Sequence, residues 1–474
     1  MLLITKMLLP QKMKSASSSA AMIGRFTAAA SYSSSASPVD DKIWLMLPSH
    51  EVKDPNPTKK TKDLEEPCKV GVHKWHESCF YDIGKKSFIT SNQENNESND
   101  QEVPKVVGSS HGYLASLKPS DCSLSLVKIP RKFYASPRLL SEEGYQLPGI
   151  DTLPAFKGKI FRQSDFNHKY GEYKVVGFAS RGGDGDDEIL ETSREVSDYF
   201  VEKIVMSDPR SSGLPTVVMT THSPQTKLSF CRGFDAQKWI HLDTNCCFSD
   251  IIYSNRDQKF YAIENSFKLE IEVWDLKDPG SPKKKILVPS FTSLSQFKKL
   301  HSYATSKMQP RLCRRYYLAE SLGEILLIIR YFDFHVAEDG TCLNCLEDSK
   351  CELPYKTVDF DVFKIDPLGK KLHSMKCLGD QALFLGINHS FAVSAREIQG
   401  IEGNSIYFGD HYMLNHSHFR GEKNYAYGGH DFGIFNLEEK RVSSCYATQT
   451  MKLMHPPVWV APTSYLVRDQ NSNF

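Results

Sequence analysis

The sequence predicts an all-β fold, a β-propeller of antiparallel three- to four-stranded blades, about six or seven in number. Three observations favour this fold. Short runs rich in Val, Ile, Tyr and Phe are separated by Gly, Asp, Asn and Pro. A meander of three or four such runs recurs about every 40 to 50 residues. The chain has 474 residues, which is more than the competing fold, a flat β-sandwich, needs for one core.

The predicted strands fill most of the region from residue 113 to residue 437, and turn-forming residues bound each of them. They are Tyr113–Leu117, Leu124–Ile129, Phe200–Met206, Thr216–Thr221, Lys227–Cys231, Trp239–Leu242, Ile251–Ser254, Phe260–Glu264, Leu269–Leu276, Tyr316–Glu320, Ile325–Tyr331, Val358–Ile365, Lys371–Cys377, Ala382–Leu385, Ser405–Phe408 and Phe432–Leu437. One segment, SLSQFKKLHSYA at 293–304, has apolar residues at helical spacing and predicts a helix inserted between strands.

The segment 249–276 is the clearest single unit of the repeat. Near its end, apolar residues alternate with glutamates: Leu269, Glu270, Ile271, Glu272 and Val273. This alternation predicts a strand with one apolar face and one face in water, after which Trp274 turns an aromatic ring outward. The same strand and turn pattern returns at 317–332, 360–386 and 431–442. In a propeller, each such sheet buries both faces against its neighbours.

The first 37 residues differ from the rest of the chain. They contain three lysines and one arginine, are dense in Ser and Ala, and no acidic residue precedes Asp40. A basic segment that also carries Leu2, Leu3, Leu8 and Leu9 is typical of a mitochondrial transit peptide. A chloroplast transit peptide has a similar composition, and a disordered tail is the remaining alternative.

The chain is therefore expected to divide into four parts. These are a mitochondrial transit peptide at 1–37, an N-terminal segment with disordered linkers at 38–107, the propeller at 108–445 and a C-terminal tail at 446–474. Three polar stretches, 49–67, 90–104 and 181–191, contain too few apolar residues to order themselves and are expected to be solvent loops.

Composition narrows the possible partners. The formal net charge is +1, so the chain as a whole has no strong field for nucleic acid or anionic lipid. No apolar run approaches the roughly 20 residues that a membrane span needs. The 12 cysteines show no spacing typical of a disulfide framework, and most are expected to be buried thiols.

The segment Gly108 to Gly112, GSSHG, matches the G-x-S-x-G pattern of serine hydrolases. In those enzymes the central serine, here Ser110, lies on a turn between a strand and a helix. Here the strand-like segment YLASL follows directly, so the pattern predicts a tight turn at the entry to a blade, with glycine supplying the unusual backbone angles. The alternative function of this motif is that of the nucleophile segment in a serine hydrolase.

A group of cysteines is the candidate metal site. Cys342, Cys345 and Cys351 follow the spacing C-x-x-C-x5-C, with His335 and Cys377 elsewhere in the same region. A C-x-x-C turn can present two thiolates to zinc, but the second pair of ligands has no regular spacing. We therefore expect these residues to be loop thiols, with zinc binding as the alternative.

Four further groups of polar residues are interpreted as surface features rather than binding sites: an acidic loop, a set of histidines and two small basic patches. The acidic loop lacks the register of a calcium-binding loop, and the basic residues lack the aromatic residues that stack on RNA bases. The residues are Asp184, Asp186, Asp187 and Glu188; His411, His416, His418 and His430; Lys283, Lys284 and Lys285; and Arg311, Arg314 and Arg315. The sequence thus predicts no catalytic residue, no cofactor, no metal site and no nucleic-acid partner.

Five segments in the same order resemble the plant KIB-type β-propeller family. They are GSSHGYLASL at 108, FCRGFDAQKWIHLD at 230, SDIIYSNRDQKFYAIENSFKLEIEVWDL at 249, YLAESLGEILLIIRYF at 317 and VFKIDPLGKKLHSMKCLGDQALFLG at 362. The resemblance spans roughly 108 to 440 and is greater to the organelle-targeted branch, in which a transit peptide replaces the F-box. It implies a propeller fold. Family members with an F-box resemble substrate receptors of ubiquitin ligases, and some bind and inhibit a kinase.

The chain departs from the F-box pattern at 44–67. Leu47 and Pro48 match the opening of an F-box, but the residues that follow are charged and broken by proline, so they predict no adaptor-binding helices. We therefore predict a non-enzymatic organellar propeller that acts as a protein-interaction module. The alternatives are an F-box-like substrate receptor of a ubiquitin ligase and the serine hydrolase.

Overall fold

The computed structural model describes the part of the chain that contains the predicted strands. The described residues are 42–47, 79–90, 104–129, 144–153, 160–161, 175–178, 189–192, 197, 200–209, 215–221, 228–244, 247–265, 269–288, 313–334, 355–366, 368, 371–410, 431–445 and 456–461. All of them belong to the compact unit Asp40–Phe474. The predicted transit peptide and the predicted helix at 293–304 lie outside the described residues.

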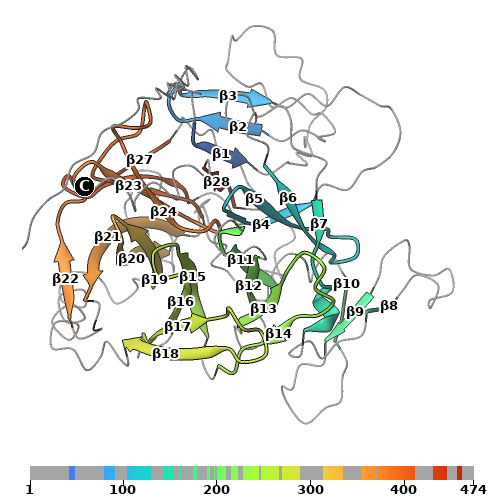
Figure 1. The fold of residues 1–474 in the computed structure, drawn as a ribbon. Coiled ribbons are helices and arrows are strands. Elements are labelled where there is room, and N and C mark those ends of the chain that lie inside the picture. Colours follow the sequence, from blue (N-terminus) through green and yellow to red (C-terminus); the bar gives the residue numbers. More distant parts are fainter. Residues whose placement is uncertain are drawn as a thin grey trace, which may run out of the picture. The chain divides into compact units, whose positions relative to one another are not determined.

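Four sheets of the described residues have four strands each (Figure 1), and we number them as blades 1 to 4. Blade 1 contains β28 (Val458–Val460), β1 (Trp44–Leu47), β2 (Cys79–Asp82) and β3 (Ser87–Thr90). Blade 2 contains β4 (Lys105–Ser110), β5 (Tyr113–Leu117), β6 (Leu124–Lys128) and β7 (Gly144–Gln146). Blade 3 contains β11 (Val201–Met206), β12 (Thr216–Thr221), β13 (Leu228–Arg232) and β14 (Ile240–His241). Blade 4 contains β15 (Phe248–Ser254), β16 (Lys259–Glu264), β17 (Ile271–Asp275) and β18 (Lys283–Val288).

A nine-stranded sheet supplies two more blades, because its halves meet only through one parallel pair, Glu320 with Phe391. Blade 5 contains β19 (Cys313–Ser321), β20 (Glu324–Phe334), β21 (Tyr355–Ile365) and β22 (Leu372–Met375). Blade 6 contains β24 (Phe391–Ser394), β23 (Gln381–Leu385), β25 (Ser405–Phe408), β26 (Gly433–Asn436) and β27 (Arg441–Ser443). A small sheet of β8 (Ile160–Phe161), β9 (Val175–Phe178) and β10 (Ile189–Thr192) lies between blades 2 and 3 in sequence. The described strands thus form six blades, within the predicted range.

Apolar layers between successive blades hold the fold together. Leu126 of blade 2 packs in one layer with Ile204 of blade 3, and Phe230 of blade 3 packs with Trp274 of blade 4. Corresponding layers lie between blades 4 and 5, 5 and 6, 6 and 1, and 1 and 2. Because the series returns to blade 1, the six blades form a closed ring in which each sheet is covered on both faces, the arrangement of a β-propeller.

The ring closes where the last described strand joins the first. β28 pairs antiparallel with β1, with Trp459 opposite Leu45, and the two strands lie side by side in Figure 1. Propellers leave only short, protected sheet edges, and this pairing covers the inner edge of β1. Blade 1 therefore combines residues 44–90 with residues 458–460, so the ring extends on both sides of the range 108–445 expected for the propeller.

Most predicted strands are confirmed, and three of them, β5, β12 and β25, have the predicted ends. The interpretation of β17 was wrong in one respect. Glu272 and Trp274 were expected to face water and to point outward, but both are buried, and the Trp274 Nε1 donates to the Glu272 carboxylate at 2.9 Å. The reason is that blade 3 covers this face of blade 4 while blade 5 covers the other.

The repeat units predicted from the sequence also differ from the blades. The segment 360–386 was interpreted as one unit, but β21 and β22 complete blade 5 while β23 belongs to blade 6. Among the described cysteines, Cys122, Cys231 and Cys445 are buried and Cys377 is exposed, and all are free thiols. Burial raises the pKa of both Cys231 and Cys445 to about 12. None of the described residues form a helix that is long and apolar enough to cross a membrane.

Candidate functional site

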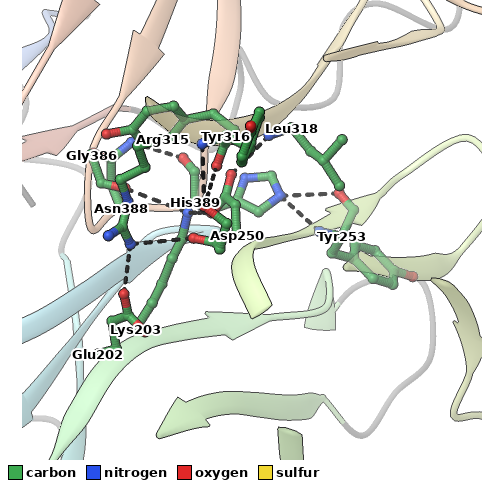
Figure 2. A network of polar contacts seen from close by, with 12 residues as sticks. Glu202, Lys203, Asp250, Tyr253, Arg315, Tyr316, Leu318, Gly386, Asn388 and His389 are labelled. Atoms are coloured by element: carbon green, nitrogen blue, oxygen red, sulfur yellow. Dashed lines mark hydrogen bonds and ion pairs between the residues drawn. The ribbon is translucent and has the colours of Figure 1, made fainter. Parts of the chain in front are cut away.

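The inner strands of the ring carry a buried ion pair. The Nζ of Lys203 on β11 lies 2.5 Å from the Oδ1 of Asp250 on β15, and both side chains are almost fully buried (Figure 2). The other carboxylate oxygen, Oδ2, accepts the backbone N–H of Leu318 on β19 at 2.9 Å. Burial lowers the pKa of Lys203 and raises the pKa of Asp250, because each charge is held out of water. One carboxylate thus joins blades 3, 4 and 5.

A second polar layer lies at the start of the same inner strands. Arg315 on β19 forms an ion pair with Glu202 on β11 at 2.6 Å and donates to the carbonyl of Ser249 on β15 at 3.2 Å (Figure 2). The Ser249 hydroxyl donates to the Tyr316 carbonyl and accepts the Tyr316 N–H. Arg315 was interpreted as part of a small basic patch, but its guanidinium contacts Glu202 in blade 3 and Ser249 in blade 4.

A short buried segment, which we call the axial loop, spans Gly386 to Ser390 between β23 and β24. It contacts the inner strands of three other blades. The Gly386 carbonyl accepts from Lys203 Nζ at 3.4 Å, and the backbone N–H of His389 donates to the carbonyl of Ser109 on β4 at 2.7 Å. The Nε2 of His389 lies 3.1 Å from the backbone nitrogen and 3.0 Å from the carbonyl oxygen of Tyr253 on β15 (Figure 2). The axial loop therefore links blade 6 to the inner strands of blades 2, 3 and 4.

The imidazole of His389 is held in its neutral form. Its pKa is lowered well below the usual value, first by burial and then by the nearby His111 and Lys203. Its ring centroid lies 5.1 Å from that of His111. A second positive charge at this place would face Lys203 without water to screen it, so protonation of His389 opposes folding.

We expect the protein to lose stability as the pH falls below about 6.5, the ordinary pKa of histidine in an unfolded chain. The unfolded state binds a proton there that His389 does not bind in the folded state. The variant His389→Gln lacks this titrating group, so its free energy of unfolding should fall less with decreasing pH than that of the wild type. The two slopes should differ by up to about 1.4 kcal/mol per pH unit. Urea denaturation of both proteins from pH 7.5 to about 5.5 measures it. Parallel pH profiles would show that His389 is not the titrating group.

Three turns meet at the far ends of the inner strands, and we call them the turn face. They are His111–Gly112 after β4, Asn255–Gln258 after β15 and Leu322–Gly323 after β19. The Nε2 of His111 donates to the Oδ1 of Asn255 at 3.1 Å, and the backbone N–H of Asn255 donates to the Glu320 carboxylate at 2.9 Å. The three turns, from blades 2, 4 and 5, are thus fixed to one another.

The outer part of the turn face exposes a mixture of charged and apolar groups. Arg256 forms a bidentate ion pair with Asp257 at 2.9 Å, and its guanidinium also donates to the Gly323 carbonyl. The Arg256 hydrogen bonds lower the pKa of the Asp257 carboxyl. The side chain of Arg256 remains 39% exposed, and Leu322 is 62% exposed. A fixed arginine beside an exposed leucine can contact a partner with little loss of side-chain entropy.

The backbone at Leu322 is strained. Its φ is 49° and that of Gly323 is 72°, the left-handed conformation that suits asparagine and glycine in a two-residue hairpin turn. Leu322→Asn should therefore raise the free energy of unfolding by about 1 kcal/mol. The matched control is Leu368→Asn, because Leu368 is also exposed, at 71%, and its φ is not positive. Denaturant melts of the two variants test the prediction, and a destabilised Leu322→Asn would contradict it.

The G-x-S-x-G motif lies within this site and is not followed by a helix. Gly108 to Ser110 end β4, His111 and Gly112 form the turn, and β5 begins at Tyr113. The predicted tight turn is confirmed, with a φ of 81° at Gly112.

Ser110, His111 and Asn255 contact one another in the order of a catalytic triad. Ser110 Oγ lies 3.0 Å from His111 Nδ1, and His111 Nε2 contacts Asn255. However, Ser110 Oγ also donates to the Met206 carbonyl at 3.0 Å and accepts the Met206 N–H at 3.2 Å. The hydroxyl is buried and joins blade 2 to blade 3, which is a structural use of the serine rather than that of an activated nucleophile.

The structure describes only some of the other predicted site residues. Lys283, Lys284 and Lys285 lie on the exposed edge strand β18, where Lys284 contacts Glu272 at 3.4 Å. Lysines on such an edge oppose pairing with another chain. The residues that lie outside the described part of the chain are His335, Cys342, Cys345 and Cys351; Asp184, Asp186, Asp187 and Glu188; His411, His416, His418 and His430; and Arg311. The described residues contain no group of three metal-ligating side chains.

The sequence interpretation missed Lys203, Asp250 and His389. A signal existed for the first two, because each is a charged residue in or beside an apolar segment that predicts a buried strand. Opposite charges in two such segments favour a pair. No comparable signal marks His389, because its contacts come from strands far away in sequence.

The closed ring, its covered sheets and its hydrogen-bonded inner strands define a β-propeller. Its blades are antiparallel except in blade 6, which has five strands and pairs β23 parallel with β25. A family model described as KIB1-4 beta-propeller matches residues 80–436. Since this match covers most of the chain, the protein belongs to the KIB1-4 β-propeller family, which confirms the resemblance found in the sequence.

Curated relatives include plant F-box proteins. The chain is 24% identical over 267 residues to F-box protein SKIP23 of Arabidopsis thaliana, which covers 55% of this chain and 58% of that protein. It is 44% identical over 86 residues to F-box protein At2g17690 of the same plant, covering 16% and 20%. The chain thus spans little more than half the length of the first relative. Among solved structures, the WD40 domain of SCAP from fission yeast is 11% identical with a TM-score of 0.22, covering 62% of this chain and 56% of that one.

Proposed function

We propose that this protein is a non-enzymatic organellar propeller that binds another protein through its turn face. The observation that carries the proposal is the strained, exposed Leu322 in a turn where asparagine is favourable. Backbone strain of this kind concentrates at functional sites. The neighbouring Arg256 adds a residue type that is enriched at protein interfaces, and its ion pair with Asp257 orients it before a partner arrives.

The second candidate function is a substrate receptor of a ubiquitin ligase, which the F-box relatives favour. An F-box is helical, whereas Trp44–Leu47, where the sequence offers an F-box-like Leu-Pro pair, forms the strand β1 in blade 1. Co-purification of the chain with an adaptor of the SKP type would support the ligase role and overturn the proposal.

Proximity labelling in plant cells, with the labelling enzyme fused to the C-terminus, tests the interaction. We expect the wild-type chain and Leu368→Asn to label the same proteins, and we expect Leu322→Asn to lose one or more of them. Because Leu322→Asn should be at least as stable as the wild type, the loss would report on binding rather than folding. The same labelled set in all three would contradict a role for the turn face.

We infer the organellar localisation from residues 1–37, which contain basic residues and no acidic residue. A fluorescent protein fused to residues 1–40 should enter mitochondria. Import into chloroplasts would support the alternative address, and a cytosolic signal would contradict an organellar role.

A further inference from the structure

The axial loop carries three polar atoms that have no hydrogen-bond partner among the described residues. These are the Oδ1 of Asn388, the Nδ1 of His389 and the Oγ of Ser390. Their residues are consecutive and only 0%, 4% and 1% exposed, respectively. Buried polar atoms in native proteins are almost always hydrogen-bonded, to protein or to ordered water. Three orphaned atoms in a row, at the centre of the ring, therefore indicate a bound molecule.

The chemistry of the three atoms restricts what this molecule can be. The Asn388 Oδ1 accepts hydrogen bonds, because the Nδ2 of the same amide already donates to the His389 carbonyl at 2.9 Å. The Ser390 hydroxyl can donate or accept. If His389 Nε2 accepts the Tyr253 N–H, then Nδ1 carries the proton and donates; if Nε2 donates to the Tyr253 carbonyl, then Nδ1 accepts. The binder must therefore donate to Asn388, and it must also accept a hydrogen bond if Nδ1 of His389 carries the proton.

We propose that the axial loop binds buried water molecules, which complete the hydrogen bonds of Asn388, His389 and Ser390. Water meets either tautomer of His389, and it is small enough for a site whose side chains are closed off from solvent. A metal ion is disfavoured, since two of the three atoms belong to neutral amide and hydroxyl groups and the nearby Asp250 is already paired with Lys203. The waters would attach the axial loop of blade 6 to the centre of the ring.

A crystal structure of the full chain at about 1.5 Å resolution tests the proposal directly. We expect water density within about 2.6–3.2 Å of Asn388 Oδ1, His389 Nδ1 and Ser390 Oγ. Absence of density beside all three atoms, or a protein group in their place, would overturn it.

The melting temperature of Ser390→Ala is a second test, because the proposal and its alternative predict opposite changes. If the Ser390 hydroxyl binds water, the variant loses that bond and melts at a lower temperature than the wild type. If the buried hydroxyl has no hydrogen bond, the variant loses only the cost of burying it. The melting temperature then stays the same or rises, which would contradict the proposal. Ser249→Ala is the matched control, because Ser249 Oγ is bonded to both backbone groups of Tyr316 and the variant should melt at a lower temperature in either case.

Discussion

Replacing Asp250 with alanine should lower the free energy of unfolding by about 3–5 kcal/mol, the usual cost of breaking a buried ion pair by removing one partner. Two groups lose their acceptor in this variant. The ammonium of Lys203 loses the carboxylate and keeps a 3.4 Å contact with the Gly386 carbonyl, and the Leu318 N–H loses the carboxylate as its acceptor. Since these groups belong to blades 3 and 5, the effect should appear as destabilisation of the whole ring in urea melts.

The matched controls separate the buried pair from charge loss in general. Lys364 and Glu324 form an ion pair of 2.9 Å on the surface of blade 5, with side chains 40% and 36% exposed. Glu324→Ala should cost no more than about 1 kcal/mol, because water screens the pair. The double variant Lys203→Met with Asp250→Asn should recover much of the loss, since no charge is left unpaired and an amide oxygen can still accept from Leu318. An Asp250→Ala variant as stable as Glu324→Ala would contradict the central role of the pair.

Replacing Trp459 with alanine should cost about 3–5 kcal/mol, because the largest side chain of β28 is fully buried where the ring closes. The indole packs edge-on against Phe384 and Tyr407 of blade 6, with ring centroids 5.3 Å and 5.9 Å away. Its Nε1 also donates to the Leu385 carbonyl at 3.1 Å. One side chain thus ties blade 1 to blade 6.

A conservative variant distinguishes packing from the hydrogen bond at this closure. Trp459→Phe keeps an aromatic ring but loses the donor to Leu385, so it should be destabilised by less than Trp459→Ala. Guanidinium or urea melts of the two variants measure the difference. If Trp459→Ala unfolds within about 1 kcal/mol of the wild type, then β28 does not carry the closure of the ring.

Much of the ring could be predicted from local sequence. Segments such as Tyr113–Leu117 and Thr216–Thr221 are rich in β-forming residues and bounded by turns, so their strands were found with the correct ends. The pairing of β28 with β1 could not be found in this way, because it joins residues more than 400 positions apart and β28 has only three residues. The alternation of apolar residues and glutamates in β17 predicts one face in water, but blade 3 covers that face.

The site was harder to predict than the fold. The tight turn at His111 and Gly112 follows from its glycine and from the strands around it. The contacts of the axial loop depend on three other blades meeting at the centre, and that geometry exists only after the ring has closed. The strain at Leu322 is likewise a property of the folded hairpin, although Leu-Gly in a two-residue turn is an unusual choice that the sequence displays.

In the proposed function, the residues that hold the ring together differ from the residues that would contact a partner. The inner strands and the axial loop hold the blades through Lys203, Asp250 and His389, while the turn face exposes residues that contribute little to that network. Changes at Leu322 should therefore alter binding without unfolding the ring, and changes at Asp250 should unfold it.

The most direct test of this account is an experimental structure of the full chain, examined at the closure of the ring. We predict that Val458–Val460 pairs antiparallel with Trp44–Leu47, with position 459 opposite position 45, and that the axial loop reaches Tyr253 and Ser109 from blade 6. A last strand that pairs with any other segment, or sheets that do not return to β1, would contradict it.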